Sequence, residues 1–240
     1  MKRKLFYGLL TGLLSLFFVS CATLPDGKKD SQKFSFTYKT VEVSEKLEYL
    51  DTKIKYPQFD AFPDLNKRIE NTILSNWKNF KSYSKGEWND IVELNNRGTS
   101  KLPPFEYLVN FEVSGNKTII SVLLDTYVFN GGAHGSTTLT SLNYDTTTNK
   151  YIDVTKASGM TYNELSSVCR NTLYKRLIDD NKAALPPGQE DSMREMINTG
   201  AFPQAGNFEI FTVDGAKVYV LFEPYSVAPY AYGSQKVQVK

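Results

Sequence analysis

The strongest constraint on the fold is a predicted β-hairpin near the middle of the 240-residue chain. In FEYLVNFEV, apolar residues occupy every second position from Phe105 to Val113, which is the period of a strand with one buried face. Gly115-Asn116 then offers a two-residue turn, and TIISVLLDTYVF returns. The apolar run from Ile119 to Leu124 is unbroken, which predicts a central strand covered on both faces.

Helical periodicity on either side of the hairpin completes the predicted fold. An amphipathic helix with Asp64 as its N-cap is indicated by apolar residues at Leu65, Ile69, Ile73, Trp77 and Phe80. Further helices are expected over 162–180 and 189–198, and the polar segment 82–104 is interpreted as a long loop or mobile strand edge. Additional strands are expected at 33–43, 52–56, 136–144, 150–154 and 234–239, and in a hairpin that turns at Asp214-Gly215. We therefore predict an α+β fold in which a mostly antiparallel sheet is packed by two or three helices.

The N-terminus has the pattern of a secretory signal. Lys2, Arg3 and Lys4 precede an apolar run over 5–20, which is short for a membrane span. Ser20 directly before Cys21 resembles the lipobox of bacterial lipoproteins, although Phe18 stands where leucine is usual. This resemblance implies that Cys21 is acylated and becomes the first mature residue. The alternative is an uncleaved anchor helix, and both predict an exported, membrane-attached protein.

Composition divides the chain into four predicted parts. Residues 1–20 are the signal peptide, and 21–33 (CATLPDGKKDSQK) are too polar to pack and form a flexible tether. Residues 34–128 form a strand-helix-hairpin domain, and 129–240 form a second domain that contains the sequence GGAHG. We expect the two domains to pack as one unit.

Charge and cysteine content argue against a nucleic-acid-binding protein and against a fold held by internal disulfides. Removing 1–20 leaves 25 basic and 26 acidic residues, a net charge of −1 with both signs mixed along the chain. A nucleic-acid-binding protein would show a basic stripe, so we expect no nucleic-acid partner. With Cys21 acylated, only Cys169 remains, so no internal disulfide can form. Cys169 shares a predicted helical face with Leu165 and Leu173 and is interpreted as a buried apolar thiol.

The sequence YVFNGGAHGS contains the only histidine of the chain, His134. A catalytic zinc needs about three protein ligands, and neither a zinc-binding histidine spacing nor a Gly-x-Ser-x-Gly nucleophile motif is present. No metal, cofactor or catalytic residue is therefore predicted, and a hydrolase with His134 as general base is kept as the alternative. We expect Gly131, Gly132 and Gly135 to permit positive φ, and Asn130 and His134 to cap backbone groups.

A second loop, SVAPYAYG, is rich in aromatic residues and proline. Tyrosine in a loop offers a rigid apolar face with a polar hydroxyl, which suits the recognition of proteins or sugars. The alternative is a loop that plugs one end of a sheet. The candidate ligand-contact residues of the two loops are Asn130, Gly132, His134 and Gly135, together with Tyr225, Pro229 and Tyr230.

Three stretches in order resemble a pair of exported domains of unknown function. KYPQFDAFPDLNKRIENTI is similar to the opening of the first domain, TYVFNGGAHGSTTLTSLNYDTTTNKYIDV to the core of the second, and LFEPYSVAPYAYGSQKVQV to its ending. This pair occurs in the extracellular part of lysozyme-binding anti-sigma factors and beside the catalytic domain of some peptidoglycan deacetylases. The resemblance implies an exported binding module that works near the cell wall.

This chain departs from both relatives. Only four residues precede the apolar run, which argues against a cytoplasmic sigma-factor-binding segment, and no stretch supplies a second domain with metal-binding histidines. We therefore expect a lipid-anchored ligand-binding protein of the bacterial cell envelope. Its expected partners are the membrane, through Cys21, and a protein such as lysozyme or a cell-wall glycan such as peptidoglycan. A purely structural envelope lipoprotein is the third hypothesis.

Overall fold

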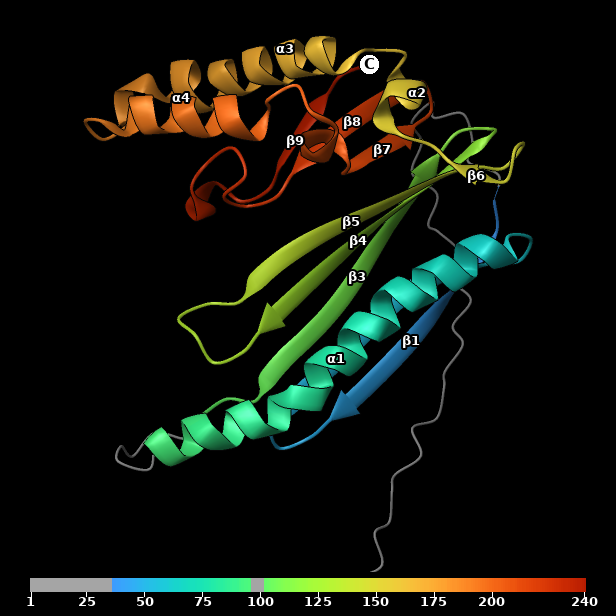
Figure 1. Ribbon diagram of the computed structural model, residues 1–240, viewed down its shortest axis with the longest axis vertical. Coiled ribbons are helices and arrows are strands. Elements are labelled where there is room, and N and C mark those ends of the chain that lie inside the picture. The colour runs from blue at the N-terminus through green and yellow to red at the C-terminus, as the bar shows by residue number, and fades with distance from the viewer. Residues whose placement is uncertain (1–35, 96–101) are drawn as a thin grey trace, which may run out of the picture.

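Two β-sheets organise the residues that this computed structural model describes, 36–95 and 102–240. A six-stranded sheet has the order β1-β2-β3-β4-β5-β6, and a three-stranded sheet has the order β7-β8-β9 (Figure 1). All neighbouring strands are antiparallel except β2 and β3, which are parallel. The α+β prediction with mostly antiparallel pairing is confirmed, and the described residues contain four α-helices, more than the two or three expected.

The element bounds follow the chain order. The six-stranded sheet contains β1 (Tyr38–Lys46), β2 (Leu50–Phe59), β3 (Phe105–Gly115), β4 (Ile119–Phe129), β5 (Ser136–Asp145) and β6 (Lys150–Tyr151). The three-stranded sheet contains β7 (Phe211–Asp214), β8 (Lys217–Phe222) and β9 (Gln235–Gln238). The α-helices are α1 (Pro63–Asn95), α2 (Val154–Ser158), α3 (Tyr162–Leu173) and α4 (Gln189–Gly200).

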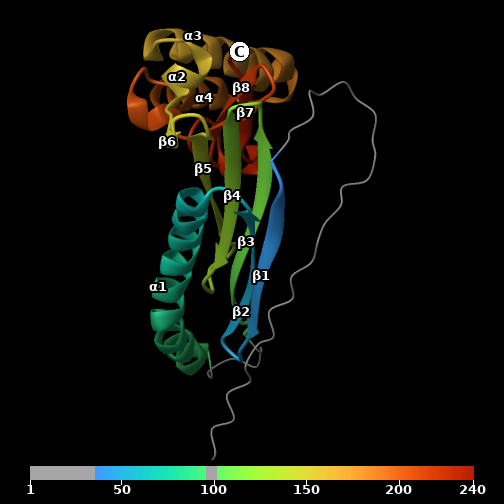
Figure 2. The same cartoon turned by 90° about the vertical axis from the view of Figure 1, so that its right-hand side faces the viewer.

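The predicted central hairpin forms as β3 and β4, with α1 along one face of the sheet (Figure 2). Its turn is longer than the two residues expected, because Gly115 pairs with Ile120 and residues 116–118 lie between the strands. The Asn116 side chain closes this turn by accepting hydrogen bonds from the backbone N–H groups of Thr118 and Ile119, at 3.0 and 2.9 Å.

Strand β4 is covered on both faces, as its unbroken apolar run predicted. Ile120, Val122 and Leu124 are buried in one core with the inward stripe of α1. Leu123 faces the other way and packs with Leu221 of β8. Burial of each such side chain contributes about 1.5–3 kcal/mol. Strand β4 therefore lies between the core that contains α1 and a small cluster that contains Leu221.

Helix α1 is longer than predicted, and it starts two positions earlier. It continues through 82–95, where a loop was expected, because Trp88 and Ile91 prolong the apolar stripe against the same core. The sequence pattern is interrupted at Ser84, which is buried and donates its hydroxyl to the Phe80 carbonyl oxygen. The helix begins at Pro63, so Asp64 lies within the first turn and not at the N-cap.

The helix expected over 162–180 changes its winding after Leu173. A π-helical turn spans Tyr174–Ile178 and a 3₁₀ segment spans Asp179–Ala184. The predicted apolar face is confirmed, since Leu165, Cys169 and Leu173 are fully buried. Burial raises the pKa of the Cys169 thiol to about 12, which makes this group a packing residue and not a nucleophile.

The two sheets are joined through side chains that complete the outer edge of β7. The Phe211 N–H donates to Ser141 Oγ at 3.0 Å, and the Val213 N–H donates to Ser121 Oγ at 2.9 Å. Asn143 Nδ2 donates to the Phe211 carbonyl oxygen at 2.8 Å, and Ser121 donates to the amide oxygen of Asn143. We call Ser121, Ser141 and Asn143 the serine–asparagine seam. It satisfies backbone groups that an edge strand would otherwise leave unpaired.

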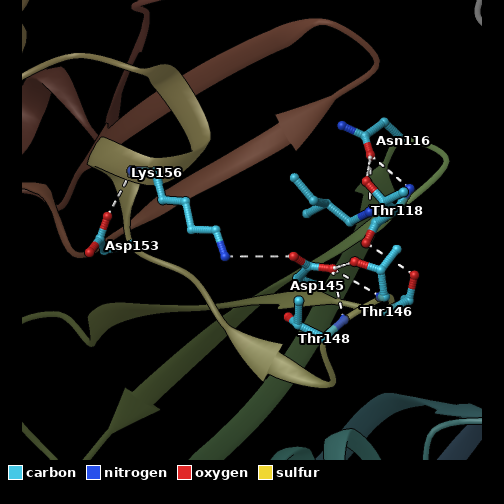
Figure 3. Close-up of polar contacts among 9 residues, drawn as sticks. Asn116, Thr118, Asp145, Thr146, Thr148, Asp153 and Lys156 are labelled. Carbon is cyan, nitrogen blue, oxygen red and sulfur yellow. Dashed lines mark hydrogen bonds and ion pairs between the residues drawn. The ribbon is translucent and has the colours of Figure 1, made fainter.

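A second polar connection lies where β5 ends (Figure 3). Asp145 accepts hydrogen bonds from the side chain and backbone of Thr147 and from the backbone of Thr148. These hydrogen bonds lower the pKa of Asp145 to about 2, so its carboxylate is charged in all but strongly acidic solution. The Nζ atom of Lys156, on α2, lies 3.7 Å from the Asp145 carboxylate. The backbone N–H of Lys156 donates to the side chain of Asp153, which caps α2.

The six-stranded sheet crosses the domain boundary expected between residues 128 and 129. Strand β5 pairs with β4 along its length, and β6 extends the same sheet. The second hydrophobic core is built chiefly from α2, α3, α4 and the three-stranded sheet. Within 36–95 and 102–240, no helix has the length and apolar character needed to cross a membrane. The predicted signal peptide, Cys21 and the tether lie outside the described residues.

Replacing Asn143 with alanine tests the seam. The substitution leaves the Phe211 carbonyl and the Ser121 hydroxyl buried without their partner, so we expect the free energy of unfolding to fall by about 2–3 kcal/mol. Asn110→Ala on β3 is the matched control, because the Asn110 side chain is exposed and should lose less than about 0.5 kcal/mol. Urea unfolding measures both. Equal losses would show that the seam does not stabilise the fold.

Candidate ligand-binding site: an aromatic rim

The two loops singled out by the sequence meet in the structure. The glycine-rich loop, 130–135, follows β4, and the aromatic loop, 223–233, follows β8. The Tyr230 hydroxyl donates to the Gly135 carbonyl oxygen at 3.2 Å. The rings of His134 and Tyr230 are stacked, with centroids 4.4 Å apart and an interplanar angle of 21°. Two segments nearly a hundred residues apart therefore form one surface.

Tyr225 extends this stack toward solvent. Its ring lies 5.5 Å from that of Tyr230, and 59% of the residue is exposed. We call His134, Tyr225 and Tyr230 the aromatic rim. A run of three adjacent rings, with the outermost largely exposed, provides apolar contact area beside polar hydroxyl and imidazole groups.

Tyr225 occupies a conformation that favours glycine. Its φ is 70°, and the Ser226 N–H donates to the Glu223 carbonyl oxygen at 3.0 Å across a turn with Pro224 in second position. This is the arrangement of a type II turn, whose third position is normally glycine or asparagine. A side chain there costs roughly 1–2 kcal/mol. Backbone strain of this kind concentrates at functional sites.

The aromatic loop is held firmly on its inner side. Val227 and Ala228 are buried, and the Tyr232 N–H donates to the Pro229 carbonyl oxygen at 2.9 Å. The end of α4 packs directly beneath, since a Cβ atom at Gly200 would lie 2.0 Å from the Ser226 carbonyl oxygen. The rim is thus presented by a pre-organised loop, which lowers the entropic cost of binding.

One side chain ties the aromatic loop to the large sheet. Glu223 Oε1 accepts the backbone N–H of Leu139 at 2.6 Å. Leu139 lies on β5, and β6 pairs with that strand only at Tyr144 and Asp145. The Leu139 N–H therefore has no strand partner on the outer side of β5. Glu223 was not among the predicted site residues, because its partner is 84 positions away in the chain and no local pattern indicates it.

The glycines of the first loop serve different purposes, which corrects the expectation that all three permit positive φ. Only Gly131 has a positive φ, at 91°. Gly135 is needed for space, because a Cβ atom there would lie 2.3 Å from the ring of Tyr127. Gly132 meets neither constraint, since the nearest atom to its Cβ position is the His134 carbonyl oxygen at 3.8 Å.

His134 interacts with backbone and with an aromatic ring. Its Nδ1 lies 2.8 Å from the Gly135 carbonyl oxygen, which only accepts, so Nδ1 is the donor in this contact. Among the described residues, His134 makes no hydrogen bond to a carboxylate or a nucleophilic side chain. The hydrolase alternative requires both groups beside the ring.

The structure brings together His134, Gly135, Tyr225 and Tyr230 from the candidate set. Pro229 shapes the aromatic loop through its carbonyl oxygen. Asn130 and Gly132 are exposed, and the Asn130 side chain makes no hydrogen bond to the described residues, so the expected cap is absent. No group of three metal-ligating side chains is found within 36–95 and 102–240.

Alanine substitutions at two loop glycines separate space from flexibility. Gly135→Ala forces the Tyr127 ring aside, so we expect a loss of about 1–2 kcal/mol in unfolding free energy and a disturbed His134–Tyr230 stack. Gly132→Ala, the control, has room and should be neutral or stabilising by up to about 1 kcal/mol. Thermal unfolding and histidine NMR shifts measure both effects. The proposed role of Gly135 would be wrong if the two variants behaved alike.

Two family models match separate parts of the chain. Residues 43–137 match the family described as Deacetylase PdaC, and residues 153–240 match the family described as Protein of unknown function (DUF3298). The glycine-rich loop lies at the end of the first match, and the aromatic loop lies within the second. Among curated proteins, none is similar enough in sequence to count as a relative.

Two solved structures are similar to this chain at low sequence identity, and the first of them shows the fold. A DUF3298 family member from Bacteroides fragilis NCTC 9343 is 15% identical, with a TM-score of 0.58 over 85% of this chain and 90% of the other. A DUF3298 family protein from Pseudomonas aeruginosa PAO1 is 16% identical, with a TM-score of 0.49 over 87% of this chain and 91% of the other. Residues 43–137 and 153–240 therefore match, in this order, the models of two families, in agreement with the pair of domains that the sequence motifs resembled.

Proposed function

We propose that this protein is a ligand-binding protein of the bacterial cell envelope, attached to a membrane through lipid on Cys21, and that it recognises a protein through the aromatic rim. The observation that carries the proposal is Tyr225, a largely exposed ring held at a backbone position where glycine would be more stable. Such a strained position is retained where the side chain is useful on the surface.

The shape and chemistry of the rim favour a protein partner. Tyrosine dominates the energetics of many protein interfaces because it buries a large area and has few torsions to restrict. Tyr225 and Tyr230 are adjacent and their loop is anchored by buried Val227 and Ala228. His134 adds a polar imidazole edge beside these rings. This combination of apolar area and a few polar groups is that of a binding hot spot.

Lysozyme is the specific partner that we propose. The support is the resemblance of the paired domains to the extracellular part of lysozyme-binding anti-sigma factors. Both domains of that pair contribute to the rim, because His134 lies in the PdaC-family match and Tyr225 and Tyr230 lie in the DUF3298 match. A membrane-attached protein that binds lysozyme would protect the nearby cell wall.

Lipid attachment is tested at Cys21. The full chain expressed in a bacterium should incorporate labelled palmitate and sediment with membranes. Cys21→Ser should abolish labelling, because an ester-linked or amide-linked acyl group requires processing at this cysteine. Cys169→Ser is the control, since the Cys169 thiol is buried and should not affect labelling. Retained labelling in the Cys21→Ser variant would contradict the proposal.

Tyr225→Gly tests the rim, because stability and binding should change in opposite directions. Relief of backbone strain should raise the unfolding free energy by about 1 kcal/mol, while loss of the ring should weaken binding to immobilised lysozyme at least about tenfold. The wild-type full chain in mild detergent should also inhibit cell-wall lysis by lysozyme.

Tyr83→Ala is the matched control, since Tyr83 is a comparably exposed tyrosine on α1. It should bind lysozyme like the wild-type protein. Absence of wild-type binding at micromolar excess would exclude lysozyme as the ligand. Wild-type binding that Tyr225→Gly leaves unchanged would exclude the rim as the site.

A further inference from the structure

A cavity of about 580 Å³ lies where the two sheets meet, at the opposite end of β5 from the rim. Its lining includes Arg68 of α1, Tyr151 of β6, Asp153, Tyr162 of α3 and Glu209. The N-terminal end of α1 lies next to β6 in both Figure 1 and Figure 2. Residues 136–140 of β5 lie between the glycine-rich loop and Ser141, the first groove residue on that strand, which separates the two surfaces by roughly 20 Å along the strand.

Two tyrosine rings line the groove. Tyr151 is 45% exposed, and its ring meets that of Tyr144 edge to face, with centroids 5.3 Å apart. Tyr162 is partly buried and stacks on Phe208 at 6.1 Å. Both rings are supported from behind by buried aromatic residues, so their orientation is determined by packing. Rings held in this way offer an apolar surface without further loss of conformational entropy.

The charged side chains of the groove have unused hydrogen-bonding capacity. Among the described residues, neither the guanidinium of Arg68 nor the carboxylate of Glu209 forms an ion pair or a hydrogen bond. Asp153 uses Oδ1 to cap α2, and its other oxygen has no partner there. Burial raises the pKa of Tyr151, and the positive charge of Arg68 opposes this shift.

The β5 side of the groove has its polar groups already hydrogen-bonded. Ser141 and Asn143 line it, but their polar atoms are engaged with β7 in the serine–asparagine seam. Recognition must therefore come from the walls, where one cationic and two anionic groups flank two aromatic rings. A phosphate would face two carboxylates, and a cationic ligand would face Arg68. The mixed signs favour an uncharged ligand that both donates and accepts hydrogen bonds.

We propose that this groove binds a neutral oligosaccharide. Pyranose rings present apolar C–H faces that pack on tyrosine, and their neighbouring hydroxyls can donate to carboxylates and accept from a guanidinium. The volume falls within the range of small-molecule sites, about 300–1,000 Å³. This inference concerns a different surface from the rim and does not depend on a protein partner there.

Chitotetraose and cellotetraose are the probes, since both are uncharged and only the first carries acetamido groups. Each is titrated into the full chain in mild detergent while Tyr fluorescence and NMR shifts are followed. We expect saturable binding of at least one probe. Tyr151→Ala should weaken it about five- to tenfold through loss of ring contact, whereas Tyr151→Phe should retain most of the affinity.

Two further variants make the result specific. Tyr83→Ala removes an exposed tyrosine outside the groove and should leave saccharide affinity unchanged, as should Tyr225→Gly at the rim. Tyr151 is half exposed, so its alanine variant should fold, which circular dichroism checks. The proposal is overturned if neither probe binds at millimolar concentration, or if Tyr151→Ala binds like the wild-type protein. Loss of lysozyme binding alone would leave it standing.

Discussion

The arrangement of this protein depends on how an edge strand is completed by side chains. Strand β7 belongs to the three-stranded sheet, but its outer edge bonds to Ser121, Ser141 and Asn143 on the face of the six-stranded sheet. Because these groups are directional and mostly buried, they determine both the distance and the angle between the sheets. Hydrophobic contact at Leu123 and Leu221 adds area but little directional preference.

The aromatic rim and the groove both depend on this junction between the two sheets. The rim combines His134, which follows β4, with Tyr225 and Tyr230, which follow β8. The groove combines α1 and β6 with residues from the second core. Neither domain alone contains a complete site, so a change at the seam would alter both. The paired occurrence of the PdaC-family and DUF3298 matches in one chain is consistent with this shared construction.

Local pattern predicted much of the fold and part of the site. Strict alternation and an unbroken apolar run identified the central hairpin and the double coverage of β4, because burial on a strand is read directly from its period. The prediction of a loop was wrong for residues 82–95. Ser84 interrupts the apolar pattern but not the helix, because its buried hydroxyl donates to the Phe80 carbonyl oxygen of the same helix. The groove was not foreseen, because its residues are polar or aromatic and scattered through the chain.

The sequence by itself determined the element types, the apolar faces and the presence of two unusual loops, because these follow from the period and conformational preferences of nearby residues. Tertiary structure alone decided that the loops touch, that Gly135 is required by the ring of Tyr127, and that Tyr225 carries strain. The physical reason is that such contacts depend on hydrogen bonds and packing between residues far apart in the chain. No local pattern records which distant group will satisfy them.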